Sequence, residues 1–232
     1  LSNASYNRSI EAYNNNPSAE RSQYDGSIQK PMTVLKILQG DSDEVGMISW
    51  FATHPNAMGA DIKLLSGDNK GHASYLFEKE HKHSTYQGNN NFVAAFAISN
   101  AGDMSPNVNP DAEGRGPTSN RFENVKIIGE RQYDKALELY DRATEQLTGS
   151  IDFSHRYVDM SSTTISGDFT DGTAKTTCVA ALGESFAAGT EDGRGPDPFE
   201  KGQTRLIMLI LAFTTMTASP KGFHLFFNGL IR

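Results

Sequence analysis

A serine lies just beyond an apolar run in the middle of this 232-residue chain. The run, residues 92–98, ends in the small polar turn Ser99–Asp103, which is followed by the sequence MSPN at 104–107. A buried strand that stops here would place the Ser105 hydroxyl at the carboxyl end of a sheet, where open α/β sheets bind ligands. A serine on such a loop is a candidate nucleophile. The same residue types also build ordinary turns, and the spacing is not that of a G-x-S-x-G elbow.

A histidine and an arginine are the other side chains that could take part in chemistry. His54 follows the apolar stretch 45–53 and precedes Pro55, so we expect it just past the end of a strand. An imidazole there could bind a metal ion or make a structural hydrogen bond, and the residues alone leave both readings open. Arg8 could donate charge-assisted hydrogen bonds to a substrate oxygen, or it could be a solvated loop residue.

The strands that would position these residues can be predicted from the apolar pattern. Residues 33–39 alternate between apolar and polar, and residues 45–53 follow the turn at 40–43, so the two segments predict a hairpin. The continuous run 92–98 predicts a central strand covered on both faces. A further strand is predicted at 153–160.

Two helices are predicted between and after these strands. Asp68 is expected to cap a helix over residues 69–82, and an amphipathic helix is expected over 122–147, ended by Gly149. Residues 1–31 are polar and predict a loop. Strands interleaved with helices indicate an α/β fold with mixed α+β layers, in which a central mixed sheet is flanked by helices.

The composition bounds the class of protein. An apolar share of 37% and a charged share of 21% are typical of a globular domain, and the net charge of −7 argues against a nucleic-acid partner. Cys178 is the only cysteine, which rules out an internal disulfide and predicts a buried, inert thiol. The most apolar segment, residues 206–212, is too short to span a bilayer, which needs about 20 apolar residues.

Several segments of the chain resemble those of the neutral ceramidases (the neutral/alkaline non-lysosomal family), in the family's order. The resemblance is dense from about Ser5 to Gly202. The matching segments are SYNRS (5–9), VGMISWFATHP (45–55), SGDNKGHASYLFEKE (66–80), FAISNAGDMSPN (96–107), KIIGERQYDKALELY (126–140) and ALGESFAAGTEDG (181–193).

This resemblance implies an enzyme, an N-acylsphingosine amidohydrolase that cleaves the N-acyl amide bond of ceramide to sphingosine and a fatty acid. It implies that Ser105 and Arg8 are catalytic, that His54 is a metal ligand, and that the complete site holds one zinc ion. It also implies a ceramide or other sphingolipid partner, access to lipid at a membrane surface, and a secreted location or one on the extracellular face of the plasma membrane. The chain opens without a signal-peptide pattern, and the resemblance says nothing of protein partners.

The resemblance further implies that the chain is an internal fragment of the family's catalytic domain, incomplete at both ends. Residues 1–202 correspond to the central part, residues 203–232 form a compressed or divergent tail, and the carboxyl-terminal immunoglobulin-like domain is absent. Ala212 stands where the family has a glutamate ligand, and the family's His-Thr-His segment would lie before residue 5. We therefore expect the chain alone to hold no catalytic zinc and to be inactive.

Two other functions stay open at this point. The first is a non-catalytic ceramidase-like remnant or binding module, which stoichiometric zinc would distinguish from an enzyme. The second is an unrelated serine amidase that uses no metal, for which His72 is the conceivable base. The sequence also leaves open whether the chain is a fragment, a splice product, a gene-model error or a decayed paralogue.

Overall fold

The computed structural model describes residues 1–59, 61–85, 91–179 and 184–195. Contacts divide the chain into two units. The first contains residues 1–146 together with 190–193, and the second contains residues 147–189 and the chain from 194 onward. All the predicted site residues lie in the first unit. The tail at 203–232, and with it Ala212, lies outside the described residues.

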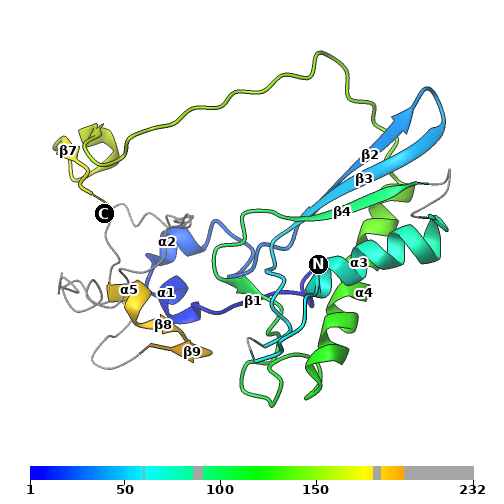
Figure 1. The fold of residues 1–232 in the computed structure, drawn as a ribbon. Coiled ribbons are helices and arrows are strands. Elements are labelled where there is room, and N and C mark those ends of the chain that lie inside the picture. Colours follow the sequence, from blue (N-terminus) through cyan, green and yellow to red (C-terminus); the bar gives the residue numbers. More distant parts are fainter. Residues whose placement is uncertain (60, 86–90, 180–183, 196–232) are drawn as a thin grey trace. The chain divides into compact units, whose positions relative to one another are not determined.

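A three-stranded mixed sheet forms the framework of the first unit (Figure 1). Strands β2 (Met32–Gln39) and β3 (Asp43–Phe51) pair antiparallel as a hairpin, with Met32 opposite Phe51. Strand β4 (Val93–Ile98) pairs with β3 in parallel. The predicted hairpin is therefore confirmed, and the carboxyl ends of β3 and β4 lie side by side, as the two predicted site segments require.

The prediction that residues 92–98 form a central strand covered on both faces is wrong for the described structure. The strand order is β2-β3-β4, so β3 is the middle strand of the described sheet. Val93 and Ile98 are 58% and 41% exposed, whereas Ala94 is buried. Only one face of β4 meets the helices. Because the strand is apolar throughout, its sequence does not show which face is covered.

Helix α3 (Asp68–Tyr75) continues directly into a π-helix, η1 (Leu76–His81). The predicted cap is wrong, because Gly67 precedes the helix and the Asp68 carboxylate accepts hydrogen bonds from the main chain of Ala57 and Met58 instead. Helix α4 (Arg121–Asp141) is capped by Asn120, whose side chain accepts from two main-chain N–H groups. It ends before the predicted end, and Gly149 lies outside it.

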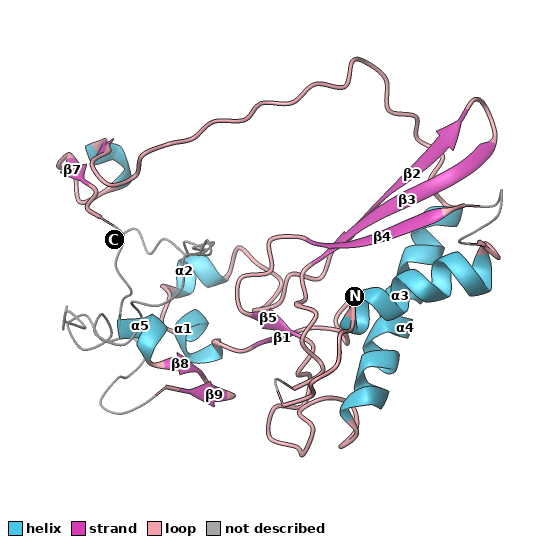
Figure 2. Ribbon diagram, viewed as in Figure 1, coloured by secondary structure: helices cyan, strands magenta, loops and turns pink. Residues whose placement is uncertain are grey.

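Helices α3 and α4 lie beside the sheet (Figure 2), and the helices and the sheet share one aromatic core. Phe77 of η1 is fully buried and packs edge to face on Tyr140 of α4, with ring centroids 5.2 Å apart. Met47 and Ala94 supply the sheet side of this core. The predicted fold class, mixed α/β layers with a mixed sheet beside helices, is confirmed.

The amino-terminal segment is not the plain loop that its composition predicts. It contains β1 (Tyr6–Asn7) and the short helices α1 (Ile10–Asn14) and α2 (Ser18–Arg21). β1 pairs antiparallel with β5 (Met104–Ser105), so the segment that carries Arg8 runs beside the one that carries Ser105.

The second unit contains small elements only, as far as it is described. They are β6 (Thr164–Ile165), the 3₁₀ turn η2 (Gly167–Phe169), β7 (Lys175–Thr176) and α5 (Glu184–Ala187). The strand predicted at 153–160 is wrong, because that stretch is irregular. Cys178 is exposed, which corrects the expected buried thiol. The strands β8 (Gly189–Thr190) and β9 (Gly193–Arg194) lie where the two units meet in sequence. Among the described residues, no helix is long and apolar enough to cross a membrane.

Candidate active site

Ser105 ends the short strand β5 and lies opposite Tyr6 of β1. Ser105 is fully buried, and its Oγ accepts a hydrogen bond from the main-chain N–H of Asn107 at 3.2 Å. Proline follows at 106, which has no N–H to donate, so the turn gives the hydroxyl its donor from Asn107. The Ser105 hydroxyl is thus fixed where β5 runs into a tight turn.

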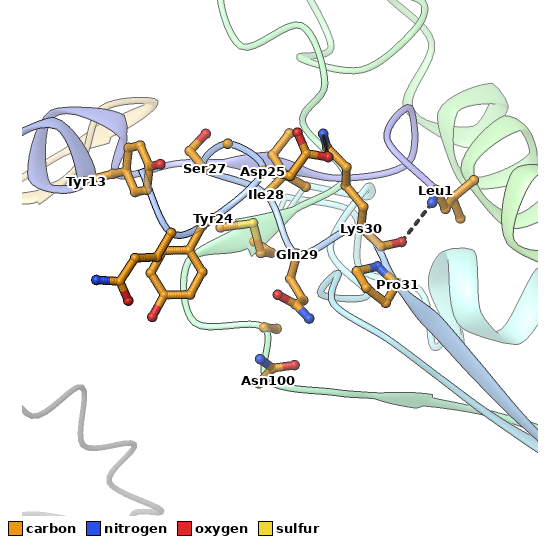
Figure 3. A pocket seen from close by; sticks show the side chains of 14 residues that line it. Leu1, Tyr13, Tyr24, Asp25, Ser27, Ile28, Gln29, Lys30, Pro31 and Asn100 are labelled. Atoms are coloured by element: carbon orange, nitrogen blue, oxygen red, sulfur yellow. Dashed lines mark hydrogen bonds and ion pairs between the residues drawn. The ribbon is translucent and has the colours of Figure 1, made fainter. Parts of the chain in front are cut away.

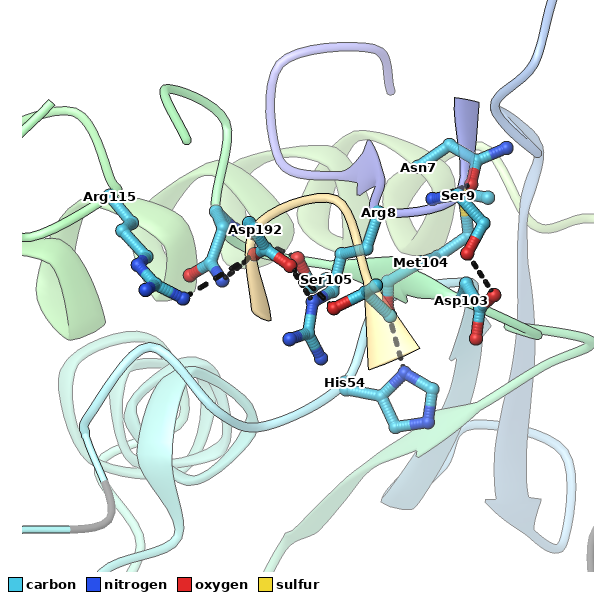
Figure 4. A network of polar contacts seen from close by, with 11 residues as sticks. Asn7, Arg8, Ser9, His54, Asp103, Met104, Ser105, Arg115 and Asp192 are labelled. Carbon is cyan, nitrogen blue, oxygen red and sulfur yellow. Dashed lines mark hydrogen bonds and ion pairs between the residues drawn. The ribbon is translucent and has the colours of Figure 1, made fainter. Parts of the chain in front are cut away.

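His54 lies past the end of β3, where the sequence predicts it, and it contacts the same turn. Both its main-chain N–H and its ring Nδ1 lie within hydrogen-bond distance of the Met104 carbonyl oxygen, at 3.2 and 2.6 Å. A carbonyl oxygen only accepts, so Nδ1 is the protonated nitrogen and Nε2 carries the lone pair. His54 therefore presents Nε2 away from the turn, as Figure 4 shows.

Arg8 follows β1 and is held by both its main chain and its side chain. Its N–H donates to the Asp103 carbonyl at 3.1 Å, and its Nε donates to the Asp192 carboxylate at 2.6 Å. The side chain is 26% exposed. Within the described part of the chain, its two Nη groups have no hydrogen-bond partner, so they can donate to a ligand.

The structure brings all three predicted site residues to one turn. Met104, one residue before Ser105, accepts from His54, and Asp103 accepts from Arg8. These contacts join segments about 50 and 95 residues apart in sequence. The order of residues along the chain would not by itself predict that these segments meet. The Asp103 carboxylate also accepts from the Ser9 hydroxyl, and this contact further fixes the amino-terminal segment on the turn (Figure 4).

Sequence reasoning missed Asp192, which has the largest number of polar contacts in this network. Its side chain is fully buried, and its carboxylate accepts from Arg8, from Asn107 Nδ2 at 2.7 Å and from Thr190 Oγ1 at 2.9 Å. Burial by itself would raise the pKa of Asp192, but the hydrogen bonds from Asn107, Arg8 and Thr190 outweigh it and lower the pKa. The sequence signal that could have pointed to Asp192 is its place in TEDG (190–193), within a segment that resembles the family.

A buried lysine connects the two strand ends that lead into the site. Lys70 of α3 is 7% exposed, and its Nζ donates to the carbonyls of Phe51 and Ala97, each at 3.1 Å. Phe51 ends β3 just before His54, and Ala97 lies near the end of β4. Burial lowers the pKa of Lys70 to about 7. Asn69, which precedes Lys70 in α3, donates from its Nδ2 to the His54 carbonyl at 3.1 Å.

The side chains in the described part of the chain do not complete a zinc site. A catalytic zinc normally has three protein ligands and one open position. His54 is suited to be one of them, because ligating histidines usually donate their other ring N–H to a carbonyl or carboxylate, as Nδ1 does here to Met104. However, the described residues contain no group of three or more His, Cys, Asp or Glu side chains placed to hold a metal. No chemical step through zinc follows from these residues.

His72 does not support a metal-free serine amidase. It lies on α3 against α4, where a Cβ added to Gly129 would come within 3.0 Å of the His72 ring or its Cβ. Burial lowers its pKa, and its Nε2 is buried without a partner among the described residues. The imidazole thus packs between the two helices, and its Nε2 makes no hydrogen bond to the described residues of the Ser105 turn.

A pocket of about 630 Å³ lies beside the turn and is lined largely by residues 23–31 (Figure 3). Tyr13, Tyr24 and Met104 give it an apolar part, and the main-chain carbonyl of Lys30 accepts from the terminal amino group of Leu1 at 2.7 Å. Met104 connects it to the site, but the three predicted site residues are not among those that line it. We therefore do not assign this pocket to the chemistry of Ser105.

Comparisons with known proteins identify the family of the chain. Residues 1–222 match the family described as neutral/alkaline non-lysosomal ceramidase, N-terminal. The chain is 43% identical over 203 residues to a neutral ceramidase of Pseudomonas aeruginosa, and 39% identical over 219 residues to neutral ceramidase B of Dictyostelium discoideum. These alignments cover 87% and 84% of this chain but only 29% and 30% of the relatives.

Solved structures show the same relationship. A structure titled as a ceramidase complexed with C2 matches with a TM-score of 0.71 at 42% identity, over 88% of this chain and 30% of that chain. The crystal structure of the Pseudomonas aeruginosa neutral ceramidase matches with a TM-score of 0.66 at 40% identity, over 79% of this chain and 28% of that chain.

The chain thus combines a mixed α/β layer fold with a serine, an arginine and a histidine gathered at one turn. The chain belongs to the neutral/alkaline non-lysosomal ceramidase family. It spans about 30% of the length of the curated relatives it matches.

Proposed function

We propose that this chain carries part of the active site of a ceramidase, an enzyme that hydrolyses the N-acyl amide bond of ceramide to sphingosine and a fatty acid. The observation that carries the proposal is the meeting of Arg8, His54 and Ser105 on one turn, through contacts to Asp103 and Met104. Membership of the ceramidase family supplies the substrate class.

In this proposal each residue has its own task. Ser105 acts on the amide carbonyl through Oγ. The Nη groups of Arg8 donate hydrogen bonds to the carbonyl oxygen, whose negative charge grows in the transition state. His54 supplies Nε2 as one zinc ligand, and the rest of the ligand set lies outside the described residues. The Ser105 side chain is fully buried, so a substrate reaches it only after covering residues have moved.

We propose further that the complete protein meets ceramide at a membrane surface, on the extracellular face of the plasma membrane or as a secreted enzyme. The support is the substrate class itself: ceramide is an apolar lipid that resides in membranes. Incubation with vesicles that contain ceramide, followed by sedimentation, tests the membrane contact independently of turnover.

Hydrolysis of ceramide by the complete protein and by its Ser105→Ala variant tests the central proposal, because we expect this chain alone to be inactive. We expect the variant to lose at least about a thousandfold in kcat, because removing a nucleophile removes the step itself. The matched control is Ser42→Ala, which alters an exposed serine in the turn between β2 and β3 and is expected to keep full activity. Unchanged turnover by Ser105→Ala would refute the assignment. A protein that folds but neither turns over ceramide nor binds zinc would instead be a non-catalytic member of the family.

A further inference from the structure

The carboxylate of Asp192 gathers donors from three separate parts of the first unit. Arg8 comes from the amino-terminal segment, Asn107 from the turn after Ser105, and Thr190 from the segment 190–193 (Figure 4). Arg115 Nη1 lies 3.9 Å from the same carboxylate. A buried carboxylate is costly unless it is paired and hydrogen-bonded, and here Oδ1 and Oδ2 both have partners.

The two oxygens hold two different components of the candidate site. Oδ1 accepts from Arg8 Nε at 2.6 Å, which fixes one edge of the guanidinium and leaves the two Nη groups at the other end. In Figure 4 this end points to the side of the network on which His54 lies. The guanidinium also lies against Gly193, where an added Cβ would come within 3.2 Å of Nη2.

Oδ2 holds the serine turn. It accepts from Asn107 Nδ2 at 2.7 Å, while the main-chain N–H of the same asparagine donates to Ser105 Oγ at 3.2 Å. Asn107 therefore connects the carboxylate to the hydroxyl through one residue. A second hydrogen bond connects the segment 190–193 to Arg8: the main-chain N–H of Glu191 donates to the Arg8 carbonyl at 2.9 Å.

We propose that Asp192 is a positioning residue of this active site, which orients Arg8 through Oδ1 and holds the Ser105 turn through Oδ2. It contacts no substrate itself. A carboxylate suits this task better than an amide, because two accepting oxygens can serve donors from several directions at once. The effect on catalysis rests on the proposed function, whereas the orientation of Arg8 does not.

A purely structural role would predict a different outcome. If Asp192 only anchored the segment 190–193, its loss would lower stability and leave the turnover of the folded protein unchanged. If it positions Arg8, its loss lowers kcat in the folded protein, and it lowers kcat by a smaller factor once the Arg8 guanidinium is already gone. The second pattern is the one we expect.

The test is a kinetic double-mutant cycle on ceramide hydrolysis by the complete protein, with Asp192→Asn, Arg8→Lys and the double variant. We expect Asp192→Asn to lower kcat about 10- to 100-fold with KM changed less than threefold, the size of effect that a small misplacement causes. The double variant is expected to lose less kcat than the product of the two single losses, because the effect through Arg8 is then counted only once. Additive losses, or full kcat in Asp192→Asn, would overturn the proposal.

A measurement without substrate separates this proposal from the proposed function. We expect the Nε–H of Arg8 to exchange slowly with water in the protein, by nitrogen-15 NMR, and at least tenfold faster in Asp192→Asn. The matched control is Asp61→Asn, which removes a surface carboxylate paired with Arg121 at 3.0 Å and should leave the Arg8 signal unchanged. An unchanged exchange rate in Asp192→Asn refutes the positioning role even if the protein is an active ceramidase. A complete protein that is inactive on ceramide but gives the expected exchange result refutes the function and keeps the orientation.

Asp192→Glu serves if the asparagine variant does not fold. It keeps the charge but moves the carboxylate by one methylene. We expect a folded protein with lowered kcat, and full kcat in this variant would count against an orienting role.

Discussion

The ring Nδ1 of His54 donates to the main-chain carbonyl of Met104, one residue before Ser105, at 2.6 Å. This bond assigns the proton to Nδ1, and it fixes the ring on the same turn that carries the candidate nucleophile. The Met104 carbonyl therefore connects the candidate metal ligand, His54, to the residue next to the candidate nucleophile, Ser105. The metal-ligand role and the structural role of His54 can be separated by substitution.

For His54, alanine and asparagine should behave differently. His54→Ala loses both ring nitrogens, and we expect a loss of about 1 kcal/mol in the free energy of unfolding from the missing hydrogen bond. His54→Asn can still donate to Met104 and should recover most of that stability, yet in the complete protein both variants should lose zinc and ceramide hydrolysis. Urea unfolding and elemental analysis measure the two effects. Full zinc content in His54→Asn would remove His54 from the ligand set.

Glu44 gives a pH-dependent contribution to stability. Lys36 and Lys82 both pair with its carboxylate and lower its pKa from 4.5 to about 2. A lowered pKa in the folded state means that the stabilisation is fully present above about pH 4.5 and is lost as the pH falls toward 2. Because the side chain is 32% exposed, we expect Glu44→Gln to cost only about 1 kcal/mol at pH 7.

The measurement is the difference in unfolding free energy between the protein and Glu44→Gln from pH 7 to pH 3. The difference should shrink across the lower part of this range. Glu138→Gln is the control, since Glu138 pairs with Lys135 and Arg142 on an exposed face and should show a smaller change. A difference independent of pH would contradict the assignment.

Lys70 should make stability rise with pH in a higher range than Glu44 does. Its folded pKa of about 7 is lowered by burial from 10.5, so between these values the unfolded chain binds more protons than the folded one. The stability of the protein relative to Lys70→Met should therefore rise from pH 7 to pH 10, by about 1 kcal/mol per pH unit. Thermal or urea unfolding at several pH values checks this. A flat difference would show that Lys70 stays charged through its two carbonyl contacts.

Phe77 should be the most sensitive position of the core among the rings described above. It is fully buried and contacts four other aromatic side chains and the His81 ring. Phe77→Ala should cost about 3–5 kcal/mol of unfolding free energy, which combines lost burial with a cavity. Phe122→Ala is the control, because Phe122 is 49% exposed and its removal should cost less than about 1 kcal/mol.

The sequence predicts the local parts of the fold better than the pairings between distant parts. The hairpin of β2 and β3 is predictable because alternation and a turn lie within one short stretch. The edge position of β4 is not, because a uniformly apolar run looks the same with one face covered or two. The π-helix after Tyr75 and the early end of α4 leave no comparable signal in residue types.

The candidate site shows the same division. Arg8, His54 and Ser105 each stand out within their own segments, and the resemblance to the ceramidases gives them roles. Asp192 does not stand out, because its role depends on its contact with Arg8, which lies 184 residues away in the sequence. Asp68 illustrates the point at shorter range: its carboxylate holds the loop after His54, where local preference predicts a helix cap.

The contact between Arg8 and Asp192 also sets an order of events during synthesis. The hairpin and α3 can form soon after they leave the ribosome, but Arg8 must wait for a carboxylate encoded 184 residues later. At roughly 5–20 residues per second, that delay is on the order of 10 to 40 seconds. Throughout it the nascent chain carries a guanidinium without its buried counterion. The site is therefore among the last parts of the first unit to be assembled, and a chain whose translation stops before residue 192 contains all three predicted site residues but not the carboxylate that holds Arg8 in place.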